Sequence, residues 1–320
     1  MQMEMNRAID IIKNSSRIAI ASHIAPDGDN VGAVLACAAF LESLGKTVTV
    51  IKTDDIPEYL QFLPGLSRYE DPCDNGASYD LFIALDCADR ARLGVAEEIF
   101  LNSCSTLQLD HHKTNPGYAM INLIEPEASS TCEVLYELIT EMNCPITSEM
   151  ATYLYVGIGM DTGRFLYSNT SKRTLEIVEN LIETDFDRNF VNQRLWQSKT
   201  LSAAKLYMMA LADVKFFKNN TVAGACVTLH MAKECGTGVE DTEDIVHFIR
   251  DIDGVRVAYL MKEKKNRVFK VSLRSKNDVD VSKIAQYFGG GGHARASGLT
   301  FHGERDELEK LLLEKIEKAL

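Results

Sequence analysis

The sequence lacks the long hydrophobic segments that would place the protein in a membrane. Among its 320 residues there is no run of 18 or more apolar residues, which is the length that a membrane-spanning helix needs. The first 16 residues have the spacing of an amphipathic helix and no apolar signal-peptide core. We therefore expect a cytoplasmic protein with no membrane contact.

Cysteine occurs, but not in the patterns that zinc sites or disulfide frameworks use. The eight cysteines are scattered and none form a C-x-x-C pair. Cys37 and Cys226 lie inside apolar stretches, where a thiol packs as a small hydrophobic group. Buried free thiols in a reducing compartment explain this usage better than disulfides or a zinc site.

Basic residues do not outnumber acidic ones either. The net charge of −12 argues against a protein that coats long nucleic acids by neutralising their phosphates. The charge is uneven, because residues 1–212 hold 16 Lys and Arg against 29 Asp and Glu, whereas residues 213–320 hold 18 against 17. Together with the length, this predicts two domains, 1–186 and 213–320, joined by a helical linker at 187–212.

The first domain alternates strand-like and helix-like segments. Apolar strand patterns occupy 17–24, 47–52, 79–89 and 105–112, and helical spacing follows at 129–143, 148–162 and 171–185. Continuous apolar strands separated by helices predict an α/β fold, with a parallel sheet and helices on both of its faces.

The second domain reads as a smaller, mixed α/β domain with paired strands. One hairpin pattern spans 255–275 and contains the charged segment 262–265, "KEKK". We interpret this segment as a solvated turn in preference to an RNA-binding patch.

Acidic and imidazole side chains follow several of the expected strands. Ligands of open parallel sheets bind beyond the carboxyl ends of the strands. The residues at these ends are His23, Asp27 and Asp29 after the first strand, Asp86 after the third, and Asp110, His111 and His112 after the fourth. Asp161 adds a carboxylate at the end of a helix rich in small residues.

These side chains have the chemistry of a metal site. Pro26 and Gly28 make "HIAPDGDN" a good turn sequence, but a turn does not explain the convergence of several strand ends. Two imidazoles and four carboxylates suit Mn²⁺ or a similar divalent ion better than Ca²⁺ or a thiolate zinc site. The set exceeds the needs of one ion, whereas two ions that share a carboxylate would use all six.

In their order and spacing, these motifs resemble those of the DHH phosphoesterase superfamily. The glycine-rich segment 289–298, "GGGGHARASG", is similar to the signature of its DHHA1 subfamily. The resemblance extends from about residue 16 to about residue 302, and the most similar branch contains the nanoRNases and pAp phosphatases. It implies a catalytic DHH domain, a substrate-binding DHHA1 domain and an active site in the cleft between them.

The resemblance also implies a division of the metal ligands between two Mn²⁺ ions. One ion would be bound by His23, Asp27 and Asp86, and the other by Asp29, Asp86, His111 and Asp161. Asp86 would then bridge the ions and count as catalytic. His112 would be the second catalytic residue, in contact with the scissile phosphate and the leaving oxygen, while Asp110 would orient an imidazole.

The glycine-rich segment is the expected phosphate clamp. Consecutive glycines allow backbone N–H groups to approach an anion closely, although a flexible loop would have the same composition. The predicted substrate-binding residues are Gly290, Gly291, Gly292, His293, Arg295 and Ser297, with Arg164 from the first domain. Arg164 could instead pair with a nearby acid, and the serines and threonine at 129–131 could cap a helix or touch substrate.

The sequence thus predicts an Mn²⁺-dependent phosphoesterase. Its implied substrates are short RNA or DNA oligonucleotides such as pApA, or 3′-phosphoadenosine 5′-phosphate (pAp), hydrolysed by a water activated between the ions. Long duplex nucleic acid is not expected, and a homodimer is left open. The alternatives are a pyrophosphatase or exopolyphosphatase of the same superfamily, and a non-catalytic nucleotide- or RNA-binding module, which would not require six metal ligands.

Overall fold

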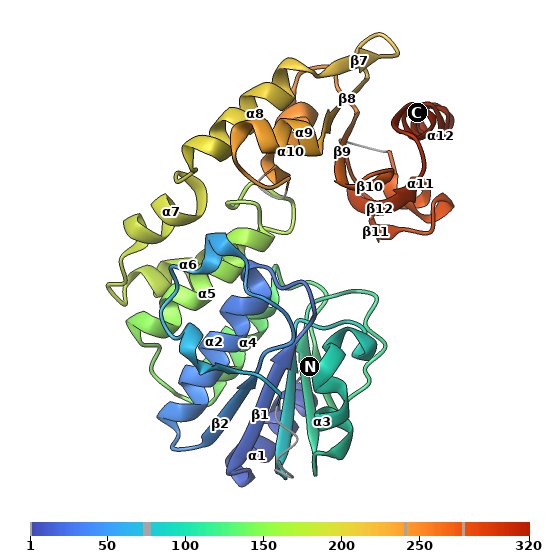
Figure 1. Ribbon diagram of the computed structural model, residues 1–320. Coiled ribbons are helices and arrows are strands. Elements are labelled where there is room, and N and C mark those ends of the chain that lie inside the picture. Colours follow the sequence, from blue (N-terminus) through green and yellow to red (C-terminus); the bar gives the residue numbers. More distant parts are fainter. Residues whose placement is uncertain (1, 73–77, 240–241, 277–278) are drawn as a thin grey trace. The chain divides into compact units, whose positions relative to one another are not determined.

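The computed structural model describes residues 2–72, 78–239, 242–276 and 279–320. The chain divides into two compact units, Met1–Ser198 and Lys199–Leu320 (Figure 1). The boundary between them falls inside the segment 187–212 that the sequence predicts to be a helical linker. Cys73 lies outside the described residues, and the other seven cysteines are free thiols.

The first unit is built on a six-stranded sheet in which every strand pair is parallel. The strand order is β3-β2-β1-β4-β5-β6. The strands are β1 (Arg17–Ser22), β2 (Thr47–Ile51), β3 (Tyr69–Glu70), β4 (Leu81–Leu85), β5 (Thr106–Asp110) and β6 (Ile121–Ile124). β4 and β5 are buried along their whole length, as expected for central strands covered on both faces.

Helices cover both faces of this sheet, and those near α2 gather on one side of it (Figure 1). The α-helices of the unit are α1 (Gln2–Asn14), α2 (Gly28–Ser43), α3 (Glu97–Asn102), α4 (Thr131–Glu141), α5 (Ser148–Asp161), α6 (Lys172–Ile182) and α7 (Arg188–Trp196). The 3₁₀ helices are η1 (Glu58–Leu60), η2 (Leu66–Arg68) and η3 (Arg90–Ala96). The predicted parallel α/β architecture is confirmed.

Two glycines allow α2 and α5 to pack very closely. A Cβ atom on Gly32 in α2 would lie 2.5 Å from the Tyr153 carbonyl oxygen in α5, and one on Gly157 in α5 would lie 2.7 Å from Asp29 Oδ1 in α2. Such separations are too short for any side chain, so both positions require glycine. This contact places the N-terminal end of α2 beside the C-terminal half of α5.

The second unit contains a mixed six-stranded sheet with the order β11-β12-β10-β9-β8-β7. Its strands are β7 (Lys215–Phe217), β8 (Val222–Val227), β9 (Val257–Lys265), β10 (Val268–Ser275), β11 (Gly291–His293) and β12 (Ala296–His302). The helices are α8 (Leu201–Ala212), α9 (Leu229–Cys235), α10 (Glu243–Asp251), α11 (Val281–Tyr287) and α12 (Arg305–Ala319). Apolar side chains of α8, α9 and α10 pack on one face of the sheet, and those of α11 and α12 pack on the other.

One local prediction for this unit is wrong, and one alternative reading of the sequence is excluded. The segment 262–265 is not a solvated turn, because β9 continues through Lys265 and Lys262 is only 1% exposed. The glycine-rich segment is not simply a flexible loop, since β11 and β12 pair as an antiparallel hairpin through it. In both cases strand pairing overrides a composition that is typical of loops.

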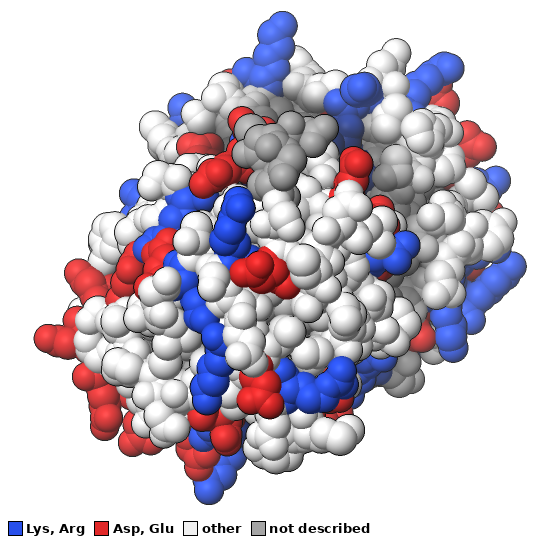
Figure 2. Space-filling model, turned by 90° about the horizontal axis from the view of Figure 1, so that it is seen from below, with Lys and Arg blue, Asp and Glu red and all other residues white. Residues whose placement is uncertain are grey.

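The surface of the molecule carries charges of both signs. On the face drawn in Figure 2, acidic and basic side chains are interspersed among uncharged residues. Across the described ranges, no helix is long and apolar enough to cross a membrane.

Candidate metal centre and active site

The candidate site lies where β1, β4 and β5 end. His23 follows β1 directly, Asp86 follows β4, and Asp110 is the last residue of β5. Because these three strands are neighbours in a parallel sheet, their carboxyl ends share one edge. The predicted convergence of the strand-end residues is therefore present in the fold.

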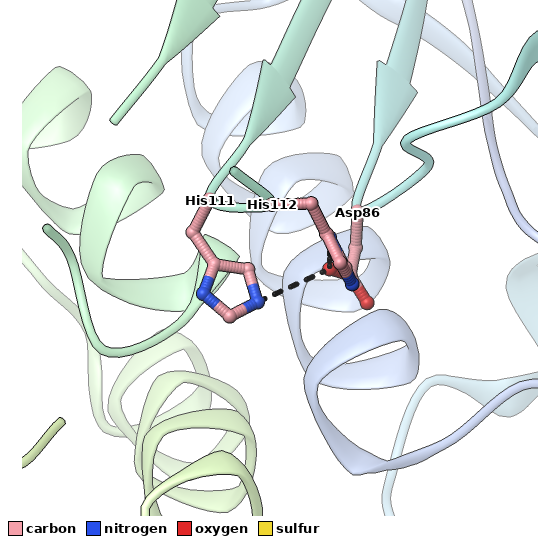
Figure 3. Close-up of side chains that lie close together, drawn as sticks. All are labelled: Asp86, His111 and His112. Carbon is pink, nitrogen blue, oxygen red and sulfur yellow. Dashed lines mark ion pairs between the residues drawn. The ribbon is translucent and has the colours of Figure 1, made fainter. Parts of the chain in front are cut away.

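Asp86 lies at the centre of the cluster and is only 2% exposed. Its carboxylate oxygens are 3.4 Å from His23 Nε2, 3.8 Å from His111 Nε2 and 3.6 Å from His112 Nδ1. Figure 3 shows the side chains of His111 and His112 close to its carboxylate. Asp86 has a φ of 51°, a left-handed conformation that Asp and Asn tolerate better than most residues.

The first predicted ligand group is assembled around His23. His23 Nε2 lies 4.0 Å from Asp27 Oδ2, and its Nδ1 lies 2.8 Å from the Ile24 carbonyl oxygen. Asp27 is the N-cap of α2, and its Oδ1 accepts a hydrogen bond from the Asn30 N–H. The turn expected at "HIAPDGDN" thus starts a helix and presents both side chains to Asp86.

The second group comes from three separate elements. His111 Nε2 is 3.1 Å from Asp161 Oδ2, at the last residue of α5. Asp29, in the first turn of α2, completes the group. Its carboxylate is 1% exposed and accepts hydrogen bonds from the backbone N–H groups of Thr131 and Cys132, at 2.7 and 3.0 Å. The N-terminus of α4 therefore holds Asp29 in place.

Asp110 and His112 form an oriented pair beside these groups. His112 Nδ1 lies 2.7 Å from Asp110 Oδ1, and the other Asp110 oxygen accepts a hydrogen bond from the Asn115 amide. Asp110 itself is fully buried. This arrangement orients the ring of His112 through Nδ1.

The electrostatics of the site reflect crowded carboxylates and imidazoles. Burial raises the pKa of Asp29 well above its ordinary value, and the charges of Asp86 and Asp161 add to this effect. Burial lowers the pKa of His111, but its hydrogen bond to Asp161 and the nearby carboxylates outweigh this and raise it to about 10. The hydrogen bond to Asp110 raises the pKa of His112. Protons thus balance charges that bound cations would otherwise neutralise.

The donor set fits divalent metal ions. Three groups of residues could each hold a metal ion, because the ligand atoms within each group all lie within 4.8 Å of one another. These groups are His23–Asp27–Asp86, Asp29–His111–Asp161 and Asp86–His111–His112. All six residues predicted as ligands belong to these groups. Mixed imidazole and carboxylate donors suit Mn²⁺ and related ions, and the sharing of Asp86 and His111 between groups is compatible with two adjacent ions.

The predicted substrate-binding residues have varied surroundings. Arg295 is exposed, and its Nη1 donates to the Val279 carbonyl oxygen. Ser297 is buried, and its hydroxyl donates to the Val281 carbonyl oxygen. Of His293 only the backbone is described. Arg164 makes no ion pair with a described acid, and its guanidinium lies 5.7 Å from the ring centre of Trp196.

The predicted phosphate clamp contains glycines that the backbone requires. A Cβ atom on Gly290 would lie 2.2 Å from the Gly298 carbonyl oxygen, whereas one on Gly291 would meet nothing within 4 Å. Gly292 has a φ of 136°, which favours glycine. The glycines therefore allow the tight hairpin and leave the exposed backbone at Gly291 open to a ligand.

Sequence reasoning missed several residues of the site. The sequence suggests a helix cap or a substrate contact for Thr131, yet its hydroxyl donates to Asp86 Oδ1 at 2.9 Å. The cap itself is made by Ser130, whose hydroxyl accepts from the Glu133 N–H. Arg92, whose Nη2 lies 3.1 Å from His23 Nδ1, carried no signal in the sequence. Its approach depends on the path of η3.

Comparison with protein families gives two matches. Residues 17–158 match the DHH family, N-terminal domain, and residues 225–320 match the DHHA1 domain. The first match spans the strand-end residues of the site up to His112, and the second contains the glycine-rich hairpin.

Individual relatives match nearly the whole chain. The bifunctional oligoribonuclease and PAP phosphatase NrnA of Thermus thermophilus is 32% identical over 95% of this chain and 90% of its own length. The protein of the same name from Bacillus subtilis is 26% identical over 98% of this chain and 96% of its own. A solved structure of an exopolyphosphatase-related protein from Bacteroides fragilis has a TM-score of 0.93, with 26% identity and coverage of 99% and 96%.

Proposed function

The chain belongs to the DHH family and carries the DHHA1 domain, so it is a hydrolase that acts on phosphoester bonds. From this premise we propose that it is an Mn²⁺-dependent enzyme that hydrolyses very short nucleotides. Its substrates in this proposal are oligonucleotides of a few residues, including pApA, which it hydrolyses to mononucleotides. Dephosphorylation of pAp to AMP is the second reaction.

One observation carries the proposal, namely the gathering of imidazoles and carboxylates around Asp86. In the proposal, His23, Asp27 and Asp86 hold one ion, and Asp29, Asp86, His111 and Asp161 hold the other. Divalent ions bound there supply a water of lowered pKa and neutralise charge on the phosphoryl oxygens. A pure binding module needs no such cluster, which favours catalysis over simple nucleotide or RNA binding.

His112 and Asp110 complete the proposed mechanism. The 2.7 Å contact between His112 Nδ1 and Asp110 Oδ1 orients the ring, and in the proposal Nε2 of the same ring faces the scissile phosphate. There His112 donates a hydrogen bond, and then a proton, to the oxygen of the leaving group. Asp110 keeps the ring oriented and stabilises its positive charge, as buried carboxylates do for catalytic histidines.

The choice of short nucleotides rests on the relatives and on the second unit. The relatives from Thermus thermophilus and Bacillus subtilis are named as oligoribonucleases and PAP phosphatases. We assign residues 213–320 to substrate binding, with the backbone at Gly291 and the guanidinium of Arg295 contacting a terminal phosphate. The free thiols support a reducing, cytoplasmic location.

A single comparative assay tests this function. The metal-free protein, supplied with Mn²⁺, is incubated with pAp, pApA, a five-residue RNA, a long RNA, pyrophosphate and polyphosphate. We expect AMP from pAp, mononucleotides from the short oligonucleotides and little cleavage of the long RNA. Activity should vanish with EDTA and return with excess Mn²⁺.

The same assay separates the second candidate function. The Bacteroides fragilis protein is named exopolyphosphatase-related, so hydrolysis of phosphoanhydrides deserves a direct comparison. Fast release of orthophosphate from pyrophosphate or polyphosphate, with inert pAp and oligonucleotides, would replace the proposed function with that of a phosphoanhydride hydrolase.

A further inference from the structure

An arginine outside the recognised motifs contacts the first metal-binding histidine. Arg92 lies in η3 and is half-buried. Its Nη2 is 3.1 Å from His23 Nδ1 and also donates to the Ile24 carbonyl oxygen at 3.2 Å. No acidic side chain among the described residues pairs with Arg92, in contrast to Arg90, which pairs with Glu97 at 2.9 Å. The guanidinium is therefore committed to the backbone and ring of residues 23–24.

The contact is reciprocal along the backbone. The Ile24 N–H donates to the Arg92 carbonyl oxygen at 2.8 Å, so the two segments are joined in both directions. A Cβ atom on Gly94, two residues further along, would lie only 2.9 Å from Ile24 Cγ2. The segments are thus closely packed, and the position of Ile24 is set by η3 as well as by β1.

This geometry gives His23 Nδ1 a partner in either tautomer. When Nδ1 carries the proton, it donates to the Ile24 carbonyl oxygen 2.8 Å away. When Nδ1 is unprotonated, it accepts from Arg92 while Nε2–H points toward Asp86 Oδ2, 3.4 Å away. Metal binding through Nε2 requires this proton to sit on Nδ1, where the Ile24 carbonyl oxygen that Arg92 Nη2 also contacts accepts it. The proton then moves from Nε2 to Nδ1 while the ring keeps its place.

We propose that Arg92 is a positioning residue that holds the imidazole of His23 ready to bind a divalent ion through Nε2. The inference rests on the proposed function, which makes His23 a metal ligand. Partners of metal-bound histidines change metal affinity by about 10- to 100-fold when they are removed. Arg92 therefore acts on metal binding without touching the ion or the reacting phosphate.

Three variants of the full-length protein test the inference, namely Arg92→Ala, Arg92→Lys and the control Arg90→Ala. Mn²⁺ binding to metal-free protein is measured by titration calorimetry, and turnover of pAp is measured against Mn²⁺ concentration. We expect R92A to weaken the binding of one Mn²⁺ ion about tenfold or more and to shift half-maximal activation by a similar factor. R92K should fall between R92A and the wild type, and R90A should match the wild type.

The decisive readout is the turnover at saturating Mn²⁺. A positioning role predicts that excess Mn²⁺ restores kcat of R92A to within about threefold of the wild type, because all ligands remain. Equal Mn²⁺ affinity in wild type and R92A would overturn the inference, and so would a kcat that excess metal fails to restore in both R92A and R92K. Absence of Mn²⁺ binding by the wild type would instead overturn the proposed function.

Discussion

Replacement of Asp86 by asparagine tests the centre of the site most directly. Asparagine keeps the size of the side chain and tolerates the φ of 51° at this position, so the backbone turn after β4 is preserved. The change removes one negative charge and one acceptor oxygen. We expect metal binding and turnover to collapse while the fold survives.

The expected magnitude follows from the distances. The Asp86 carboxylate lies 3.4 to 3.8 Å from three imidazole nitrogens, so about 4 Å is an upper value for the distance between its charge and positive charge held in this cluster. One unit charge about 4 Å from another contributes about 4 kcal/mol at an effective dielectric constant of about 20. That free energy corresponds to a loss of about a thousandfold in kcat/KM.

The assay measures kcat/KM with pAp and pApA at fixed Mn²⁺, with thermal unfolding as a check of the fold. Asp89→Asn is the matched control, because Asp89 caps η3 at an exposed position and asparagine caps equally well. The control should stay within about twofold of wild type. If D86N kept turnover within tenfold of wild type at the same Mn²⁺ concentration, the reasoning about Asp86 would be refuted.

Three further predictions concern other parts of the chain. Asp110→Asn should lower kcat about 100-fold with little change in KM or bound Mn²⁺, because His112 loses its charged partner. A loss of Mn²⁺ binding as large as the loss of kcat would contradict this. Gly157→Ala should lower the free energy of unfolding by about 2 kcal/mol, seen in urea denaturation, since its Cβ would lie 2.2 Å from Cys132 Sγ. Burial lowers the pKa of His247 to about 4, so on acidification the unfolded chain takes up a proton at this histidine before the folded chain does. The free energy of unfolding should therefore fall by about 2–3 kcal/mol from pH 6.5 to pH 4. A wild-type pH profile identical to that of His247→Gln would contradict this.

The strand-end residues could be predicted because topology alone brings them together. Parallel strands that are neighbours in a sheet end at one edge, so the apolar runs before His23, Asp86 and Asp110 were sufficient to place these residues near one another. The helical spacing of α5 likewise placed Asp161 at a helix end, although the spacing alone did not show which neighbours it would meet.

Other features depend on contacts that leave no local pattern. The clamp on Asp29 requires α4 to point its N-terminus at α2, and the contact of Arg92 with His23 requires a particular path of η3. Lys262 was misread because a lysine-rich tetrapeptide is typical of a turn, whereas its pairing with Lys270 and Val227 places it inside the sheet. Tertiary pairing decides such cases, and single-sequence patterns do not record it.

The hydrogen bonds from the N-terminus of α4 to Asp29 bear on the order of folding and metal binding. Both oxygens of this carboxylate already have donors from the chain itself, so its location is set once α2 and α4 have docked. Folding can then run to completion before any ion arrives, and metal uptake becomes a late event that needs no rebuilding of the polypeptide. Stripping the protein with a chelator and returning the metal should accordingly be a reversible cycle, completed without a denatured intermediate.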